Sequence, residues 1–180
     1  MVPGKVTYII LVAGAFLIFY WAFRKMRRKQ NKTFSHNANV AAFLWMIRSC
    51  EGTANANGYR TLFGYEYFND FSKHPNRAVT KGGYTSTAAG AYQILYKTWL
   101  FVNTRVELPD FSPESQDIAA VELIRYRGAL GDVMTGDIRS AIQKCNKEWA
   151  SLPGSPYGQP VRTLEQAIGY YTAAGGHILV

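Results

Sequence analysis

Residues 41–53 read AAFLWMIRSCEGT, and this stretch decides how the chain is expected to fold. Its apolar side chains recur at helical spacing, so one face of a helix is expected to be buried. That buried stripe consists of Phe43, Met46, Ile47 and Cys50. Asn37 or Asn39 can cap the amino end, and Gly52 ends the helix. The pattern predicts an amphipathic helix with an acid, Glu51, at its carboxyl end.

Glu51 is the side chain in this stretch that can carry chemistry. At about 100° per residue it lies beside Leu44 and Ile47, at the edge of the apolar stripe. Apolar surroundings disfavour its charged form, and the negative end of the helix dipole acts in the same direction. Both effects favour a carboxyl group that keeps its proton near neutral pH, as a general acid must. A helix-terminal glutamate that is simply solvated is the competing interpretation.

The rest of the domain is mainly helical, with one region of different character. Residues 53–87 are rich in Gly, Asn and aromatic side chains, which is typical of short strands and long loops. Helical patterns then return within residues 89–102, 112–128, 136–152 and 161–176. Ser112 before Pro113, and Asp137 after Gly136, are helix-start signals. The layout predicts an α+β, mainly helical domain over residues 39–180, with two lobes and a cleft between them.

The amino-terminal segment predicts a membrane anchor. Residues 6–23 carry no formal charge over 18 residues, enough for roughly 27 Å of helix. Tyr20 and Trp21 near its end are typical of a membrane interface. A cleaved signal peptide, the main alternative, normally has its basic residues before the apolar run, whereas here they follow it. We therefore expect a flank at 1–5, a transmembrane helix at 6–23 and a basic, polar linker at 24–38.

Charge and cysteine content exclude several classes of partner. The net charge is +8, but seven of the 20 Lys and Arg lie in residues 1–32, and the remainder holds 13 basic against 12 acidic residues. Such a balanced domain gives no reason to expect nucleic acid as a partner. Cys50 and Cys145 could form a bridge or remain two separate buried thiols. Without a Cys or His ligand pattern, no metal or other cofactor is expected.

Several motifs in order resemble one known family. They are Cys50-Glu51-Gly52-Thr53 with Asn57-Gly58-Tyr59, residues 68–75 (FNDFSKHP), residues 86–93 (STAAGAYQ), residues 110–117 (DFSPESQD), residues 127–130 (RGAL), residues 136–139 (GDIR) and residues 149–159 (WASLPGSPYGQ). Together they are similar to the phage lambda type of lysozyme, which has a lysozyme-like fold and acts as a peptidoglycan lytic transglycosylase. The resemblance covers about residues 39–176, and it does not extend to residues 1–35.

The resemblance implies that Glu51 is the catalytic acid/base for cleavage of peptidoglycan glycan strands. Hydrolytic glycosidases normally use two carboxyl groups. The acids that follow Glu51 are Glu66 and Asp70, and Arg60 stands where the lambda enzyme has an acid. A transglycosylase needs one carboxyl group only, because the sugar's own C6 hydroxyl traps the intermediate as a 1,6-anhydro ring. A hydrolytic lysozyme of the same fold, or a non-catalytic wall-binding pilot protein, are the alternatives.

Sugar-binding residues are expected among aromatic and amide side chains of the motifs. Flat rings suit a pyranose, and amides or hydroxyls can bind its polar groups. The candidates are Tyr59, Ser86, Tyr92, Gln93, Tyr157 and Gln159. Packing in the core is the competing interpretation for each tyrosine.

The basic residues after the span leave the location of the enzyme open. Positive charge at 24–32 favours a cytoplasmic side, which would point the domain away from the cell wall. One possibility is the host inner membrane, with the domain facing the wall despite this bias. The other is the internal membrane of a phage particle, where other virion membrane or capsid proteins would be neighbours.

Overall fold

The structure is a computed structural model that describes the backbone of residues 4–179 and the side chains of residues 14–179. The elements in chain order are α1 (Gly4–Ser35), α2 (Ala38–Cys50), η1 (Gly58–Arg60), η2 (Phe63–Tyr65), β1 (Val79–Lys81), β2 (Tyr84–Ser86), α3 (Tyr96–Arg105), α4 (Pro113–Tyr126), α5 (Leu130–Thr135), α6 (Ile138–Cys145) and α7 (Leu164–Ala173). The expected α+β, mainly helical class is confirmed.

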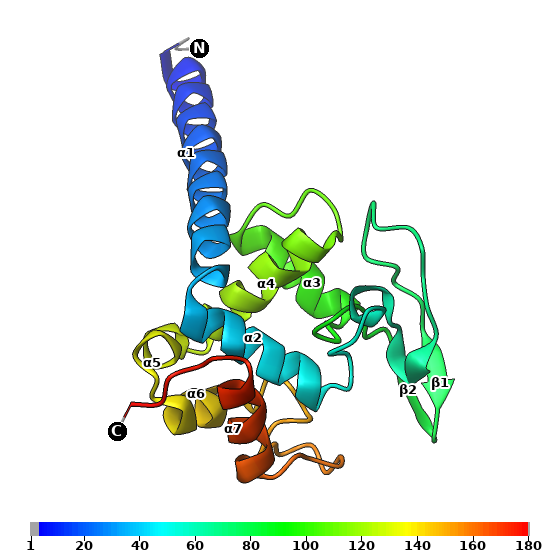
Figure 1. The fold of residues 1–180 in the computed structure, drawn as a ribbon. Coiled ribbons are helices and arrows are strands. Elements are labelled where there is room, and N and C mark those ends of the chain that lie inside the picture. The colour runs from blue at the N-terminus through cyan, green and yellow to red at the C-terminus, as the bar shows by residue number, and fades with distance from the viewer. Residues whose placement is uncertain (1–3, 180) are drawn as a thin grey trace.

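The domain has a helical part and a smaller part built from loops and one hairpin. Strands β1 and β2 pair antiparallel, with Val79 opposite Ser86 and Lys81 opposite Tyr84. In Figure 1 this hairpin lies to one side of the helices, and the amino-terminal part of α1 projects from the domain, whereas its carboxyl-terminal end packs against α4. Helix α4 runs through the centre, and its residues 118–124 are all buried. Helix α2, which ends at the candidate acid, packs against α7.

The capping residues expected from the sequence are found at the starts of α2, α4 and α6. The Asn37 side chain accepts hydrogen bonds from the N–H groups of Asn39 and Val40 and so caps α2. Ser112 caps α4 with Pro113 at its first position, and Asp137 caps α6. These side chains satisfy backbone N–H groups that the first helical turn leaves without partners.

The helix expected from residue 89 begins later, at Tyr96. Gly90 and Gln93 have left-handed backbone angles, with φ of +78° and +46°. Ala89 and Ile94 instead pair across the turn that these angles make. A left-handed residue breaks a right-handed helix, so residues 89–95 form a tight turn beside the hairpin. The helix expected over 136–152 likewise ends early, at Cys145.

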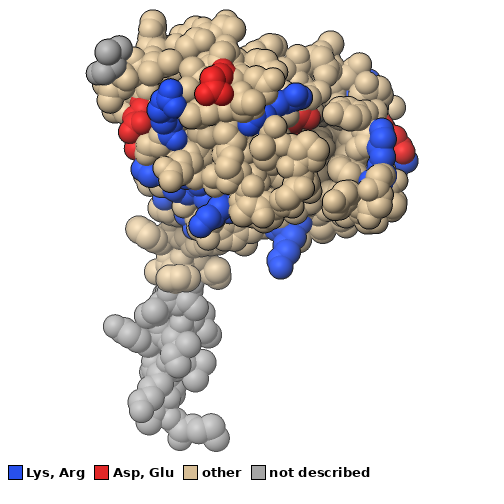
Figure 2. Space-filling model, turned by 90° about the horizontal axis from the view of Figure 1, so that it is seen from below, with Lys and Arg blue, Asp and Glu red and all other residues tan. Residues whose placement is uncertain are grey.

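The stretch read as a polar linker, residues 24–38, is instead mostly helical. Helix α1 runs to Ser35, and only residues 36 and 37 separate it from α2. Several polar side chains between residues 24 and 35 contact the domain. Arg28 and Lys32 pair with Glu114 at 2.7 and 2.6 Å, and Arg27 lies 3.7 Å from Glu122. The linker prediction is wrong for residues 24–35, because their charges meet acids of α4. Figure 2 shows basic side chains where α1 joins the domain.

The predicted transmembrane helix at 6–23 begins among residues whose side chains lie outside the description. Across the residues that are described, no helix combines the length and the apolar character needed to cross a membrane.

Candidate active site

Glu51 stands at the carboxyl end of α2, where the helix stops. Its N–H still bonds to the Ile47 carbonyl at 2.9 Å, and Gly52 turns the chain with φ of +74°. A side chain at position 52 would also approach the Tyr65 hydroxyl to 3.1 Å, so glycine suits this turn sterically as well. The helix end thereby presents the Glu51 side chain to a pocket of about 220 Å³ between the two parts of the domain.

The pocket is lined by residues from both parts of the domain. Its walls consist of Cys50, Glu51, Thr53, Thr61, Leu62, Phe63, Gly64, Tyr65, Lys81, Gln93 and Ser151. Thr61 to Tyr65, Lys81 and Gln93 come from the loop and hairpin region, whereas Ser151 comes from the segment after α6. Such a two-sided cleft with a few convergent polar groups is typical of a small-ligand site.

The environment of Glu51 is that of an acid that keeps its proton. Burial raises the pKa of the Glu51 carboxyl from 4.5 to about 7, and the hydrogen bonds from Ser151 oppose this rise. The Ser151 Oγ donates to Glu51 Oε1 at 2.7 Å. The direction expected from the sequence is confirmed. A carboxyl group with such a pKa can donate a proton at neutral pH and take one back.

Ser151 is a site residue that sequence reasoning missed, although it lies within one of the quoted motifs. It is 100 residues from Glu51 in the chain. Its neighbours hold it in place: Leu152 is fully buried, and the Trp149 indole N–H donates to the Tyr92 carbonyl at 3.1 Å. The motif WASLPG thus packs its apolar members and presents the serine to the acid.

Glu51 is the only carboxylic acid among the described residues that line the pocket. Glu66, half exposed, pairs with Arg77, and Asp70 is exposed and accepts a bond from the Ser72 N–H. Arg60 donates to the Phe68 carbonyl and to Asn69, so it is part of the loop scaffold. The second carboxyl group that hydrolysis normally uses is therefore not found beside Glu51 in this part of the chain.

Of the six residues predicted to bind sugar, the structure places Gln93 in the pocket. Its amide nitrogen donates to the carbonyls of Gly90 and Thr61, and these bonds hold its left-handed backbone in place. Strained backbone of this kind is found at functional sites more often than elsewhere. Gln93 thus has a fixed side chain on the wall of the pocket that Glu51 also lines.

Tyr59 and Tyr92 have a structural role instead of the predicted contact with sugar. Both hydroxyls donate to Asp117 Oδ1, at 2.9 and 2.6 Å, and the ring of Tyr92 is fully buried. Burial raises the pKa of Tyr59 to about 12, and the negative charge of Asp117 adds to this rise. These hydroxyls therefore remain protonated donors that link α4 to the loop region.

The other three predicted residues lie outside the pocket walls. The Ser86 hydroxyl accepts from the Ala88 N–H at 3.0 Å at the end of β2. The Tyr157 hydroxyl donates to the Lys147 carbonyl at 2.8 Å, and its ring is exposed, as is Gln159. Tyr157 and Gln159 belong to the segment between α6 and α7, which also carries Ser151.

The two cysteines are separate, and both are buried free thiols. Burial raises the pKa of each to about 12, so neither is a nucleophile at neutral pH. Cys50 contributes an apolar wall beside Glu51. No group of acids, histidines or cysteines suited to a metal ion occurs in the described part of the chain.

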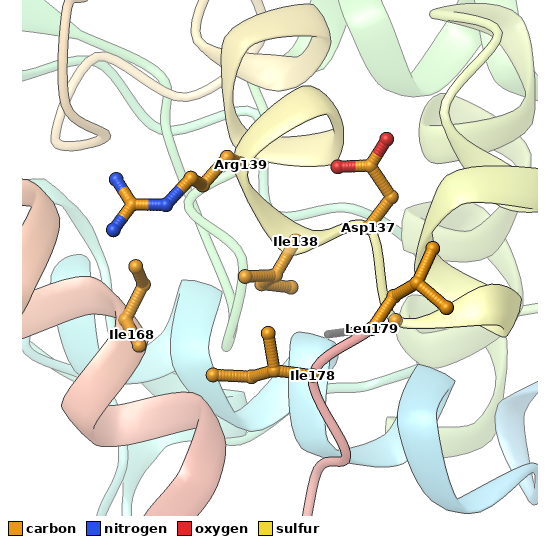
Figure 3. A pocket seen from close by; sticks show the side chains of 7 residues that line it. Asp137, Ile138, Arg139, Ile168, Ile178 and Leu179 are labelled. Atoms are coloured by element: carbon orange, nitrogen blue, oxygen red, sulfur yellow. The ribbon is translucent and has the colours of Figure 1, made fainter.

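A second pocket, of about 150 Å³, lies between α6, α7 and the carboxyl-terminal segment (Figure 3). Three isoleucines and Leu179 form most of its wall, and Asp137, its acid, is the cap of α6. The Asp137 side chain is already used to cap α6, so the pocket at Glu51 is the better candidate for catalysis.

Comparison with known proteins agrees with this geometry. A protein-family model described as Endolysin matches residues 41–178. The endolysin of Escherichia phage P2 is 43% identical over 154 residues, covering 77% of this chain and 93% of that protein. The endolysin of Escherichia phage lambda is 42% identical over 149 residues, with coverage of 79% and 94%.

Solved structures give the same result. The lysozyme of bacteriophage lambda complexed with a chitohexasaccharide is 41% identical, with a TM-score of 0.75 over 79% of this chain and 97% of that one. A second structure of lysozyme from bacteriophage lambda matches with a TM-score of 0.71 at 39% identity and the same coverage. The chain therefore belongs to the endolysin family, the lysozyme-like phage enzymes that cleave the glycan of peptidoglycan.

Proposed function

We propose that this endolysin is a lytic transglycosylase with Glu51 as its single acid/base. It cleaves the β-1,4 bond between N-acetylmuramic acid and N-acetylglucosamine and leaves a 1,6-anhydro-muramic end. The observation that carries this proposal is a lone carboxyl group in the pocket, with a pKa of about 7 and no second acid among the described lining residues.

The proposed reaction uses one carboxyl group twice, first as an acid and then as a base. Protonated Glu51 gives its proton to the glycosidic oxygen, and the bond from that oxygen to C1 of the muramic residue breaks. The C6 hydroxyl of the same residue then attacks C1, and its proton passes to the Glu51 carboxylate. Glu51 ends the cycle protonated, and no water is consumed. An attached nucleophile has a high effective concentration, so no second carboxylate is needed to activate water.

Ser151 and Gln93 support this cycle. The Ser151 hydroxyl stabilises the carboxylate that exists between the two proton transfers, since its hydrogen bond to Glu51 favours the charged form. Gln93, fixed by its bonds to Thr61 and Gly90, offers its amide oxygen to sugar hydroxyls or to the N-acetyl group. A glycan in this cleft agrees with the chitohexasaccharide bound by the related lambda lysozyme.

The products distinguish this mechanism from hydrolysis. Purified sacculi digested with the enzyme should yield fragments with 1,6-anhydro-muramic ends, which are lighter by one water than the reducing ends that a hydrolase makes. Mass spectrometry of the soluble fragments separates the two. Reducing muramic ends as the main product would support the hydrolytic alternative and contradict the transglycosylase mechanism.

We also propose that residues 6–23 anchor the enzyme in a lipid bilayer, in the host inner membrane or in a phage membrane. The support is the uncharged run itself and the strong exposure of the side chains that follow it on α1, with Phe16, Ile18 and Phe19 each about 70% or more exposed. Such a group of large apolar side chains in water is unfavourable. The full-length chain should float with vesicles in a density gradient. A full-length chain that stays with the soluble fraction would contradict the anchor.

A further inference from the structure

The wall of the Glu51 pocket includes a cationic side chain, Lys81, that has no role in the proposed reaction. Lys81 lies at the end of β1, and its ammonium donates to the Gly64 carbonyl at 2.9 Å. The same ammonium lies 5.3 Å from the centre of the Tyr65 ring. Among the described residues no carboxylate forms a salt bridge with Lys81. An ammonium has three N–H donors, so two remain for a ligand in the pocket.

A second cation approaches from the opposite part of the domain. The backbone N–H of Arg162 donates to the Ser151 carbonyl at 2.9 Å, so this residue lies directly beside the serine that contacts Glu51. Burial raises the pKa of the Cys50 thiol and the Glu51 charge adds to it, whereas the positive charge of Arg162 opposes both. The Arg162 side chain is exposed and forms no salt bridge with the described residues. Its charge therefore acts on the pocket from the Ser151 side.

The charge of the site differs from that of a neutral sugar-binding cleft. With Glu51 protonated, the described walls of the pocket carry the charge of Lys81 alone, and Arg162 adds a second positive charge nearby. N-acetylglucosamine oligomers are uncharged. Peptidoglycan carries carboxylates on alternate sugars, on the stem peptide where one is attached or on the lactyl group where it is not. Cations beside a protonated acid suit a ligand of that kind.

We propose that Lys81 and Arg162 bind the carboxylates of the muramyl side chain and so select peptidoglycan over neutral glycans. The proposal rests on the proposed function, since it names which part of the same substrate the two cations contact. Lys81, on the hairpin, and Arg162, on the loop before α7, hold the muramic residue from both sides of the cleft. They thereby place its C1 and C6 atoms beside Glu51.

The test crosses enzyme variants with substrate charge. The wild type, Lys81→Met, Lys81→Arg and Arg162→Gln are assayed on soluble glycan strands and on the same strands with their carboxylates amidated by carbodiimide and ammonia. Lys97→Met is the matched control, because Lys97 is an exposed lysine on α3 outside the pocket. Strands with and without stem peptides distinguish peptide carboxylates from the lactyl carboxylate.

Amidation of the substrate is expected to lower kcat/KM of the wild type and of Lys97→Met by on the order of fivefold, as for a partly exposed ion pair. Lys81→Met and Arg162→Gln should be slower on charged strands and much less sensitive to amidation, and Lys81→Arg should retain most of the rate. Equal sensitivity of all variants to amidation would overturn the proposal. If the wild type cleaves none of these strands, the proposed function itself is wrong.

Discussion

Replacement of Glu51 by glutamine is expected to reduce wall-degrading turnover by about a thousandfold, the range for loss of a general acid and base. Glutamine keeps the size of the side chain and can still accept the Ser151 hydrogen bond through its amide oxygen. It has no proton to give to the leaving sugar and accepts none from the C6 hydroxyl. Release of soluble fragments from purified sacculi measures the loss.

The stability of the Glu51→Gln variant shows whether its loss of activity comes from misfolding. The Glu51 pKa is 4.5 as a free group and about 7 in the folded chain, so the native state binds more protons between these values. Folding stability contributed by this group is therefore lost as pH rises from 4.5 to 7. Glu51→Gln should melt close to the wild type near pH 4 and at a higher temperature near pH 8. An inactive variant that melts lower at both pH values would indicate misfolding instead of lost chemistry.

Replacement of Glu122 by alanine is expected to destabilise the chain by about 3 kcal/mol, because it leaves three partly buried arginines and the buried Asn31 without their shared partner. The Glu122 carboxylate is buried, and its oxygens lie 3.0 Å from Arg105 and 3.5 Å from Arg125. From α1, Asn31 donates to it at 3.0 Å. Burial lowers the pKa of the Arg125 guanidinium, Arg27 nearby lowers it further, and Glu122 opposes this. Without Glu122 these cations would repel one another around a buried Asn31.

The control for this prediction is Glu66→Ala, which removes one half of an exposed pair with Arg77. That change should alter the free energy of unfolding by no more than about 0.5 kcal/mol. Thermal unfolding of both variants gives the comparison. A Glu122→Ala chain as stable as Glu66→Ala would show that α1, α3 and α4 do not depend on the shared carboxylate.

Much of the helical domain could be predicted because its signals are local. The Asn37, Ser112 and Asp137 caps act within three residues of the helices that they start. The raised pKa of Glu51 followed from the apolar spacing of one helix. Periodicity and capping depend on neighbours in the chain, so a sequence pattern carries them directly.

The features that were missed depend on contacts between distant segments. Ser151 meets Glu51 across 100 residues, and α1 meets Glu122 across about 90. Tyr92 is an aromatic residue of the kind that binds sugars, but its ring is buried and its hydroxyl donates to Asp117 on α4. Residues 24–35 have the polarity of a linker, but their contacts with the acids of α4 and with the end of α3 make them a packed helix. In each case the role of the residue depends on a contact with a residue distant in the sequence, and tertiary packing determines that contact.

Burial keeps the Glu51 carboxyl protonated near neutral pH. The direct measurement is a ¹³C NMR titration of protein labelled at its glutamate carboxyl carbons, with the Glu51 signal assigned by its absence in Glu51→Gln. The predicted midpoint is about 7, and Ser151→Ala should move it higher, because the serine hydrogen bond favours the charged form. A Glu51 carboxyl that titrates near 4.5 would be ionised under physiological conditions, and such a group could not serve as the acid that this account requires.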